Sequence, residues 1–266
     1  ALAVSSGTAA LVCALQAAGI GPGDEVLVPA YTWMASAGAV ALVGAVPVLV
    51  EIDESLTLNP ADLAARITPR SRAVIPVHMI NRPCDMDSIL AVARGNRLVV
   101  IEDAAQAVGV RYRGRFCGTM GEAGVFSFNQ YKNMTCGEGG AVLTSDRTLF
   151  LRALNAHDMG LGFRDTEHAD DVFVGANYRI SEIQGAILRV QLKRLHGVMR
   201  RVRRRVALLT EMFRDEGLPV APHHDPADAM SLAVTFDTED AAIAFAENRG
   251  VRRLFDNSKH VYTAWE

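Results

Sequence analysis

Short apolar runs alternate with amphipathic stretches along the first 145 residues of the chain. The apolar runs are rich in valine and isoleucine, which is typical of buried strands. They span residues 25–30, 46–52, 73–79, 98–103, 124–128 and 141–145. Helical patterns lie between several of them, at 8–19, 33–43, 60–67 and 85–94. This alternation predicts an α/β fold with three α/β/α layers around a mostly parallel sheet.

The carboxyl ends of the parallel strands are the expected position of a ligand site. Right-handed crossovers bring these ends to one edge of the sheet, and ligands of open α/β sheets bind there. Polar residues that directly follow a predicted strand are therefore the first candidates for chemistry.

The pattern changes after residue 145. Residues 147–160 and 181–216 read as helices, and the second has apolar residues near i, i+3, i+4 and i+7. Residues 231–236 predict a strand and 241–250 a helix. We therefore expect a large domain over 1–195, followed over 196–266 by a long connecting helix and a small, incomplete C-terminal α+β domain.

An arginine-rich stretch, "MRRVRRRV", occupies residues 199–206 of the long predicted helix. Such a run is usually a solvated helix face and less often an anion-binding strip. The pattern leaves both interpretations open and favours the solvated face.

Composition narrows the function classes. The 266 residues exceed the roughly 150 of one average domain, and half of them are hydrophobic, which is enough for a large core. The net charge of −3 gives no reason to expect a nucleic-acid or membrane partner. No uninterrupted apolar run reaches the length of a transmembrane helix.

The four cysteines, Cys13, Cys84, Cys117 and Cys136, are scattered and form no CxxC pair. This spacing favours reduced thiols of a cytoplasmic protein over a disulfide framework or a zinc site. We expect no metal centre.

The stretch "SSGTAAL" (5–11) places Ser5, Ser6, Gly7 and Thr8 directly before a helical run. The start of a helix offers unpaired N–H groups and the positive end of a dipole, which suit a phosphate. Serine and threonine are also ordinary N-caps, so the stretch alone does not decide between the two roles.

Two further candidates follow predicted strands. Asp103 closes the strand in "VVIEDAAQAVG", and Gln106 comes three residues later. A carboxylate in such a partly buried place needs a partner, which can be a metal, an arginine, a protonated ring nitrogen or the next helix. Trp33 follows the strand over 25–30 and either covers a flat ring or belongs to the core.

Lys132 lies in the loop of "FSFNQYKNMTCGEGG", between the predicted strand that ends at Ser127 and the glycines that lead to the next strand. An amine in apolar surroundings loses its charge more readily and becomes a nucleophile. The alternative is an ordinary surface lysine. Further along, Asn177, Tyr178 and Arg179 precede the long helix and either bind an anion or start that helix.

The order of these features points to one cofactor. Pyridoxal 5'-phosphate needs donors for its phosphate, a cover for its ring, a carboxylate for the pyridinium nitrogen and a lysine for its aldehyde. The chain offers a candidate for each in turn.

At this point the sequence resembles the DegT/DnrJ/EryC1/StrS sugar aminotransferases, a family of fold type I pyridoxal-phosphate enzymes. The resemblance rests on several motifs in the family's order over roughly residues 1–195. These motifs are "SSGTAAL", "GIGPGDEVLVPAYTW", "GAVPVLVEID", "PVHMINRPCDMDSI", "VIEDAAQAVG", "FSFNQYKNMTCGEGGAV" and "NYRISEIQGAI". Residues 1–195 would then form the PLP-binding domain of an aspartate-aminotransferase-like fold.

The resemblance implies roles for four residues around the cofactor ring. Lys132 matches the lysine that forms a Schiff base, the internal aldimine, and then moves the proton. Asp103 matches the acid that pairs with the pyridinium nitrogen. Gln106 matches the residue near the phenolic oxygen, and Trp33 matches the aromatic residue over the ring.

The resemblance also implies phosphate ligands and a partner. Gly7, Thr8 and Ser127 match residues that bind the cofactor phosphate. Asn177 matches an asparagine that reaches the phosphate in the neighbouring subunit, which implies a homodimer with shared active sites.

The implied activity is aminotransfer from glutamate or glutamine to a keto sugar or a similar polyhydroxy ketone, in the biosynthesis of amino sugars, cell-surface polysaccharides or natural products. The ketone could be nucleotide-linked, a free or lipid-linked sugar, a cyclitol or an octulosonate. The phosphates of a nucleotide would need basic residues, such as Arg164, Arg252 or Lys259. The sequence does not predict where these three residues lie relative to the site.

Three other functions are compatible with parts of this pattern to different degrees. The family's dehydratases carry a histidine at the position of Lys132, so the lysine favours aminotransfer over a sugar dehydratase or lyase. A non-catalytic, PLP-binding regulatory protein is a second alternative. A nicotinamide-dependent oxidoreductase is disfavoured because no G-x-G-x-x-G follows an early strand.

The chain also departs from the family pattern. The segment that usually precedes the phosphate loop is missing and the second domain is short. Ile80 and Asn81 stand where an aromatic residue and glycine are common, and Asn129 stands where histidine is frequent. Because asparagine tolerates a left-handed backbone, we expect the turn at Asn81 to survive.

Overall fold

A mostly parallel sheet forms the centre of the protein. The computed structural model describes residues 1–159, 173–254 and 260. Within them one sheet contains, in spatial order, β1 (Leu2–Val4), β9 (Gly140–Leu143), β8 (Ala123–Ser127), β5 (Val99–Asp103), β4 (Ser71–Val74), β2 (Glu25–Pro29) and β3 (Val46–Val50). The strands from β8 to β3 pair in parallel, and β9 pairs antiparallel with β8 and β1. The predicted sheet is confirmed.

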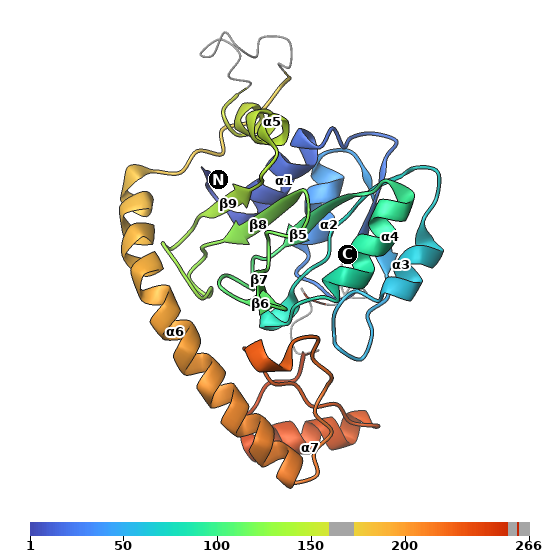
Figure 1. Ribbon diagram of the computed structural model, residues 1–266, viewed down its shortest axis with the longest axis vertical. Coiled ribbons are helices and arrows are strands. Elements are labelled where there is room, and N and C mark those ends of the chain that lie inside the picture. The colour runs from blue at the N-terminus through green and yellow to red at the C-terminus, as the bar shows by residue number, and fades with distance from the viewer. Residues whose placement is uncertain (160–172, 255–259, 261–266) are drawn as a thin grey trace.

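Helices cover both faces of this sheet (Figure 1). One layer consists of α1 (Gly7–Ala17), α2 (Ala35–Leu42) and α5 (Arg147–His157), and the other of α3 (Pro60–Arg66) and α4 (Met86–Asn96). Successive strand residues point to opposite faces. Accordingly Val26 and Val28 pack with α1 and α2, whereas Leu27 between them packs with α3 and α4. The three predicted layers are confirmed.

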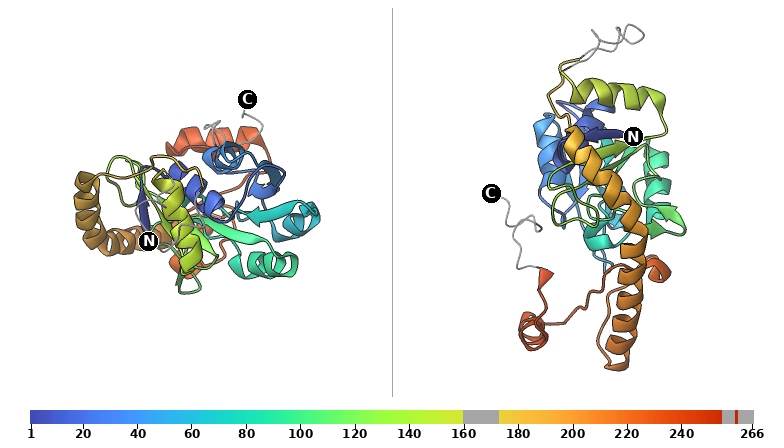
Figure 2. Two further views of the ribbon diagram at one scale, coloured as in Figure 1. Left: turned by 90° about the horizontal axis from the view of Figure 1, so that it is seen from above. Right: turned by 90° about the vertical axis from the view of Figure 1, so that its left-hand side faces the viewer.

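The long helix α6 (Glu182–Asp215) runs along one side of the sheet and extends beyond it toward the C-terminal segment (Figures 1 and 2). It begins with a capping box, in which the side chains of Ser181 and Gln184 each accept the other residue's backbone N–H. Met199 on its inner face is buried against a cluster that includes Phe126 and Phe128. The helix matches its prediction to within one residue at each end.

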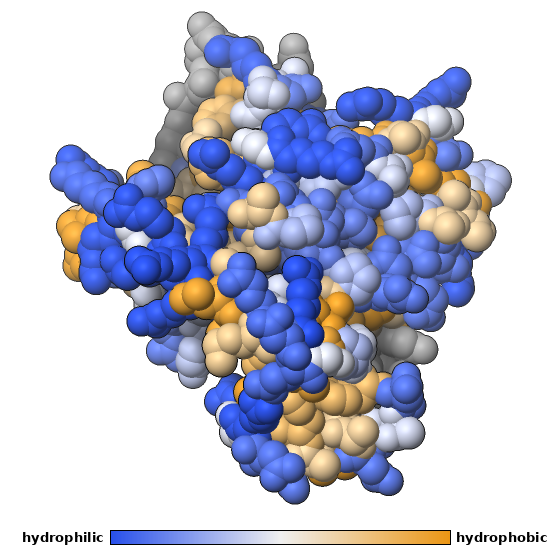
Figure 3. Space-filling model, turned by 60° about the horizontal axis from the view of Figure 1, so that its bottom comes forward, coloured by the Kyte–Doolittle hydropathy of each residue, from blue (hydrophilic) through white to orange (hydrophobic). Residues whose placement is uncertain are grey.

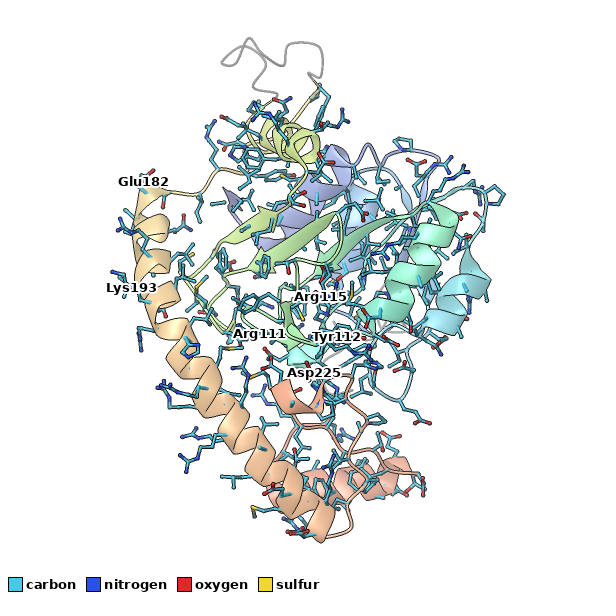
Figure 4. All side chains as sticks on the ribbon, in the orientation of Figure 1. Arg111, Tyr112, Arg115, Glu182, Lys193 and Asp225 are labelled. Carbon is cyan, nitrogen blue, oxygen red and sulfur yellow. The ribbon has the colours of Figure 1, made fainter. Side chains whose placement is uncertain are left out.

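A two-stranded ribbon contacts the C-terminal segment. The sequence pattern did not predict this ribbon. The ribbon consists of β6 (Arg111–Tyr112) and β7 (Arg115–Phe116). The backbone N–H of Arg111 donates to Asp228 at 2.8 Å, and that of Arg113 donates to Asp225 at 2.7 Å. Figure 4 shows Asp225 beside the labelled residues of the ribbon.

The C-terminal segment contains α7 (Glu239–Arg249), as predicted, but the predicted strand over 231–236 is wrong. Only one isolated bridge forms there, between Val234 and Val220. A strand needs a neighbour of similar length to pair its backbone groups, and the described residues do not supply one here.

All four cysteines are buried, unpaired thiols, as expected. In the described ranges, no helix combines the length and the apolar character needed to cross a membrane. Hydrophilic surface extends along α6 on the left of Figure 3. Four arginines of the arginine-rich stretch are exposed there, which supports a solvated helix face. They are Arg200, Arg201, Arg204 and Arg205.

Candidate active site

A cavity of about 770 Å³ opens at the carboxyl edge of the parallel strands. Seven of the eight residues that the sequence singled out for the cofactor line it. They are Gly7, Thr8, Trp33, Asp103, Gln106, Ser127 and Lys132. These residues come from the start of α1, from the segment after β2, from the ends of β5 and β8, and from the loop after β8.

The start of α1 presents backbone donors to this cavity. The hydroxyl oxygen of Ser6, the N-cap, accepts the N–H of Ala9 at 3.0 Å. The N–H groups of Gly7 and Thr8 also belong to the first turn, where no helical acceptor exists. A Cβ atom on Gly7 would stand 2.8 Å from the Cβ of Ser127, so only glycine lets the helix start approach the end of β8 this closely. The result is a compact group of N–H and O–H donors.

Asp103 lies at the end of β5 and is buried. Its Oδ2 accepts the hydroxyl of Ser36 at 2.8 Å, and its Oδ1 accepts the N–H of Ala105 at 3.0 Å. The hydroxyl of Thr32 lies 2.8 Å from that of Ser36 and extends this network. The carboxylate is thus held in place while it faces the cavity. Ser36 was not among the predicted site residues; it lies in α2, far from Asp103 in the chain.

The neighbouring Glu102 points to the opposite face of the sheet, as the alternation of strand side chains requires. Its carboxylate accepts N–H groups of Gly118 and Gly121, each at 2.7 Å, and lies 2.9 Å from Nε2 of buried His78. Burial opposes ionisation, but the hydrogen bond from His78 and those from the backbone hold the pKa of Glu102 below its usual value. Glu102 therefore fixes the loop after β7 and takes no part in the cavity.

Gln106 has one end of its amide fixed. Its Oε1 accepts the N–H of Ile80 at 3.0 Å, and the residue lines the cavity. Ile80 and Asn81 both have left-handed backbones, with φ of 47° and 61°. The expected left-handed turn at Asn81 is confirmed, whereas the left-handed isoleucine was not foreseen, because branched side chains rarely adopt it. Asn133 supports the turn by donating to Asn81 at 2.6 Å.

Lys132 follows Ser127 in a loop that returns to β9. Burial lowers the pKa of its amine, and the negative charges of Asp103 and Glu138 offset part of this effect. The net direction favours the neutral, nucleophilic amine. Lys132 is half-buried, and its predicted role as the reactive amine stays a prediction.

The C-terminal segment contributes two residues to the cavity, His260 and Arg252, that were not among the predicted site residues. The N–H of Thr32 donates to the carbonyl oxygen of His260 at 3.0 Å, and the rings of His260 and Trp33 meet edge to face with centroids 5.4 Å apart. Arg252 also lines the cavity. Burial, together with the charge of Lys132, lowers the pKa of His260. Arg164 and Lys259 lie outside the described residues.

Asn177 is the one predicted cofactor ligand that does not line this cavity. It is exposed and forms an antiparallel bridge with Asp158 beyond the end of α5. Tyr178 next to it accepts the N–H of Ser5 at 2.7 Å, which ties this segment to the start of the phosphate-loop candidate. The position of Asn177 is compatible with its predicted role toward a neighbouring subunit, and that role stays a prediction.

The chain is similar to several proteins of known name or structure. GDP-perosamine synthase of Caulobacter vibrioides is 48% identical over 198 residues, which make up 73% of this chain and 52% of that protein. DesV of S. venezuelae, solved in complex with a ketimine intermediate, has a TM-score of 0.79 and 39% identity, covering 94% of this chain and 68% of its own. DesI, solved in the presence of its TDP-sugar product, has a TM-score of 0.80 and 33% identity, covering 94% and 65%.

The chain thus spans about half the length of GDP-perosamine synthase. The model of the DegT/DnrJ/EryC1/StrS aminotransferase family matches residues 1–254, almost the whole chain. The protein therefore belongs to the DegT/DnrJ/EryC1/StrS aminotransferase family.

Proposed function

We propose that the protein is a pyridoxal-phosphate-dependent sugar aminotransferase. It would move an amino group from glutamate or glutamine to a keto sugar or a similar polyhydroxy ketone. The observation that carries this proposal is the convergence of Lys132, Asp103 and the donor group at Gly7 on one cavity. The cytoplasm is the proposed compartment.

The residues of the cavity fit this cofactor. The N–H groups of Gly7 and Thr8 and the hydroxyl of Ser127 suit a phosphate, because they combine a helix start with a hydroxyl donor. The absence of a side chain at Gly7 lets Ser127 lie against the helix start, which brings its hydroxyl close to these N–H groups. Asp103 suits a ring N–H, Trp33 a ring face and Gln106 a phenolic oxygen.

Each residue contributes a separate step of binding or proton control. Asp103, which Ser36 holds in place, would pair with the ring nitrogen and so keep a proton on it. When bound, pyridoxal phosphate supplies an electron sink and carries the amino group between the two substrates. Nζ of Lys132, whose pKa burial lowers, would hold the cofactor by condensing with its aldehyde, whose oxygen would leave as water. Once released, the same amine would take up and return a proton.

The substrate class follows from two observations together. The names of two relatives contain nucleotide sugars, GDP-perosamine and a TDP-sugar. Arg252 lines the cavity and supplies a cation for an anionic group. We therefore propose a nucleotide-linked keto sugar as the acceptor.

We also propose a homodimer in which Asn177 of each subunit completes the phosphate site of the other. Exposed apolar residues at the start of α6, Ile183 at 74% and Val190 at 59%, lie close to Asn177 in the chain and favour a covered surface. Mixing inactive Lys132→Ala and Asn177→Ala subunits tests this arrangement. Shared sites predict that activity returns in the mixture, because one of the two sites in a mixed dimer is intact.

The experiment for the activity combines absorbance with product analysis. The protein loaded with pyridoxal phosphate should lose its cofactor absorbance band on addition of glutamate and release 2-oxoglutarate, and Lys132→Ala should do neither. Failure of every common amino donor would instead favour a dehydratase or lyase. If Lys132→Ala kept full biological activity, a non-catalytic regulatory protein would be the better description.

A further inference from the structure

Asn129 organises the loop that carries Lys132 through both its side chain and its backbone. Its Oδ1 accepts the N–H of Tyr131 at 3.1 Å, and its carbonyl oxygen accepts the N–H of Lys132 at 3.0 Å. Its own N–H donates to Oγ of Ser127 at 3.4 Å. Asn129 thus connects the end of β8 to the backbone of the reactive lysine.

The same side chain also closes the loop. Nδ2 of Asn129 donates to Oε1 of Glu138 at 2.5 Å, across nine positions of the chain. Glu138 is held from the other side by α6, because Nε2 of Gln184 donates to its carbonyl oxygen at 2.7 Å. The two ends of the loop are therefore joined by one charge-assisted hydrogen bond and anchored to the long helix.

We propose that Asn129 is a positioning residue for Lys132, and that it sets the direction of the lysine amine by clamping Glu138 across the loop. The proposal rests on the proposed function, since it concerns the same lysine. The cavity is lined by Asn129, Lys132 and Glu138. Loss of the hydrogen bond between Asn129 and Glu138 would therefore change the cavity at the place where the amine reacts.

Five charged or titratable groups share the cavity with the amine: Asp103, Tyr131, Glu138, Arg252 and His260. Of these, Glu138 is joined by a hydrogen bond to the loop segment that carries Lys132. Glu138 consequently has two separable effects on the amine. The hydrogen bond between Glu138 and Asn129 affects the position of the Lys132 amine. The negative charge of Glu138 affects the pH at which that amine loses its proton.

The test measures covalent capture of pyridoxal phosphate by Lys132 between pH 6 and pH 10. Borohydride reduction fixes the adduct, and mass spectrometry of the peptide that contains Lys132 gives the capture rate. The plateau of the capture rate at high pH measures how well the Lys132 amine is positioned. The midpoint of the pH profile measures how the charge of Glu138 affects the deprotonation of that amine. Gln130→Ala is the matched control, because Gln130 is an exposed neighbour on the same loop.

The expected plateau of Asn129→Ala is roughly tenfold below that of wild type, the size of one charge-assisted hydrogen bond. Glu138→Ala should lose as much, and the double variant should lose no more, because both substitutions break the same bond. Glu138→Gln keeps an acceptor for Asn129, so its plateau should stay near that of wild type while its midpoint moves to lower pH.

An Asn129→Ala plateau equal to that of Gln130→Ala would overturn the proposal, and so would losses that multiply in the double variant. Thermal unfolding of each variant without cofactor shows whether a loss reflects the loop or general instability. Absence of capture by the wild type would contradict the proposed function itself, which separates the two failures.

Discussion

Gly7, the first residue of α1, lies against Ser127 at the end of β8, so that a Cβ atom on the glycine would stand 2.8 Å from the Cβ of the serine. Residues 120 positions apart in the chain (127 − 7) thereby form one side of the cavity. The close approach requires that one of the two residues has no side chain.

Gly7→Ala tests this contact. The added methyl group must push the helix start and β8 apart, which should cost roughly 1–3 kcal/mol of folding free energy and weaken binding of pyridoxal phosphate about tenfold or more. Gly95→Ala is the control, because that exposed helical glycine has open space around the position of its Cβ. Chemical denaturation and cofactor titration measure both quantities. Equal behaviour of the two variants would contradict the tight contact.

Asp103→Asn tests the carboxylate that is proposed to pair with the ring nitrogen. An amide keeps the shape but lacks the charge, so the rate of aminotransfer should fall roughly a hundredfold or more while folding is preserved. Ser36→Ala, which removes only the hydrogen bond to Oδ2, should cost about tenfold. Single-turnover kinetics with glutamate measure both rates. A larger loss for Ser36→Ala than for Asp103→Asn would contradict this order.

Arg252→Ala tests recognition of an anionic group. Removing the guanidinium should raise KM for the substrate that carries the anion by about tenfold, with a smaller effect on kcat. Separate half-reactions with glutamate and with a nucleotide-linked keto sugar identify which substrate it is. Arg253→Ala is the matched control, since Arg253 lies beside Glu239 at 3.6 Å. A KM unchanged for both substrates would remove Arg252 from the site.

His223 predicts a pH dependence of stability. Burial is the main reason why its pKa falls from 6.5 to about 4, and the charge of Arg82 adds to this effect. Between these values the unfolded chain binds a proton that the folded protein does not, so folding stability declines as the pH falls from 6.5 toward 4. The contribution is at most roughly 3 kcal/mol. It is fully present above pH 6.5.

Denaturation at pH 7 and pH 5 of the wild type and of His223→Gln measures this contribution. The glutamine variant should lose less stability than the wild type over that interval, because it has no proton to gain. Parallel pH dependence in the two proteins would show that another group is responsible.

Most of the fold could be predicted from the chain because its signals are local. Valine-rich runs and amphipathic stretches specify strands and helices through side-chain period, and the strand order then brings Asp103, Ser127 and Lys132 to one edge. The prediction of a strand over 231–236 was wrong because strand formation there depends on contacts that are not local. A strand exists only with a neighbour, and no local pattern tells whether a neighbour is present.

The amino-acid sequence by itself determined the layered fold, the residue types at the strand ends and the family. Only the tertiary structure decided that Glu102 turns away from the cavity while Asp103 faces it, that Ser36 holds Asp103, and that His260 joins Trp33 from the far end of the chain. The physical reason is that hydrogen bonds and ring contacts depend on distances in space. Residues far apart in the sequence acquire such contacts only after the sheet and its covering helices have packed.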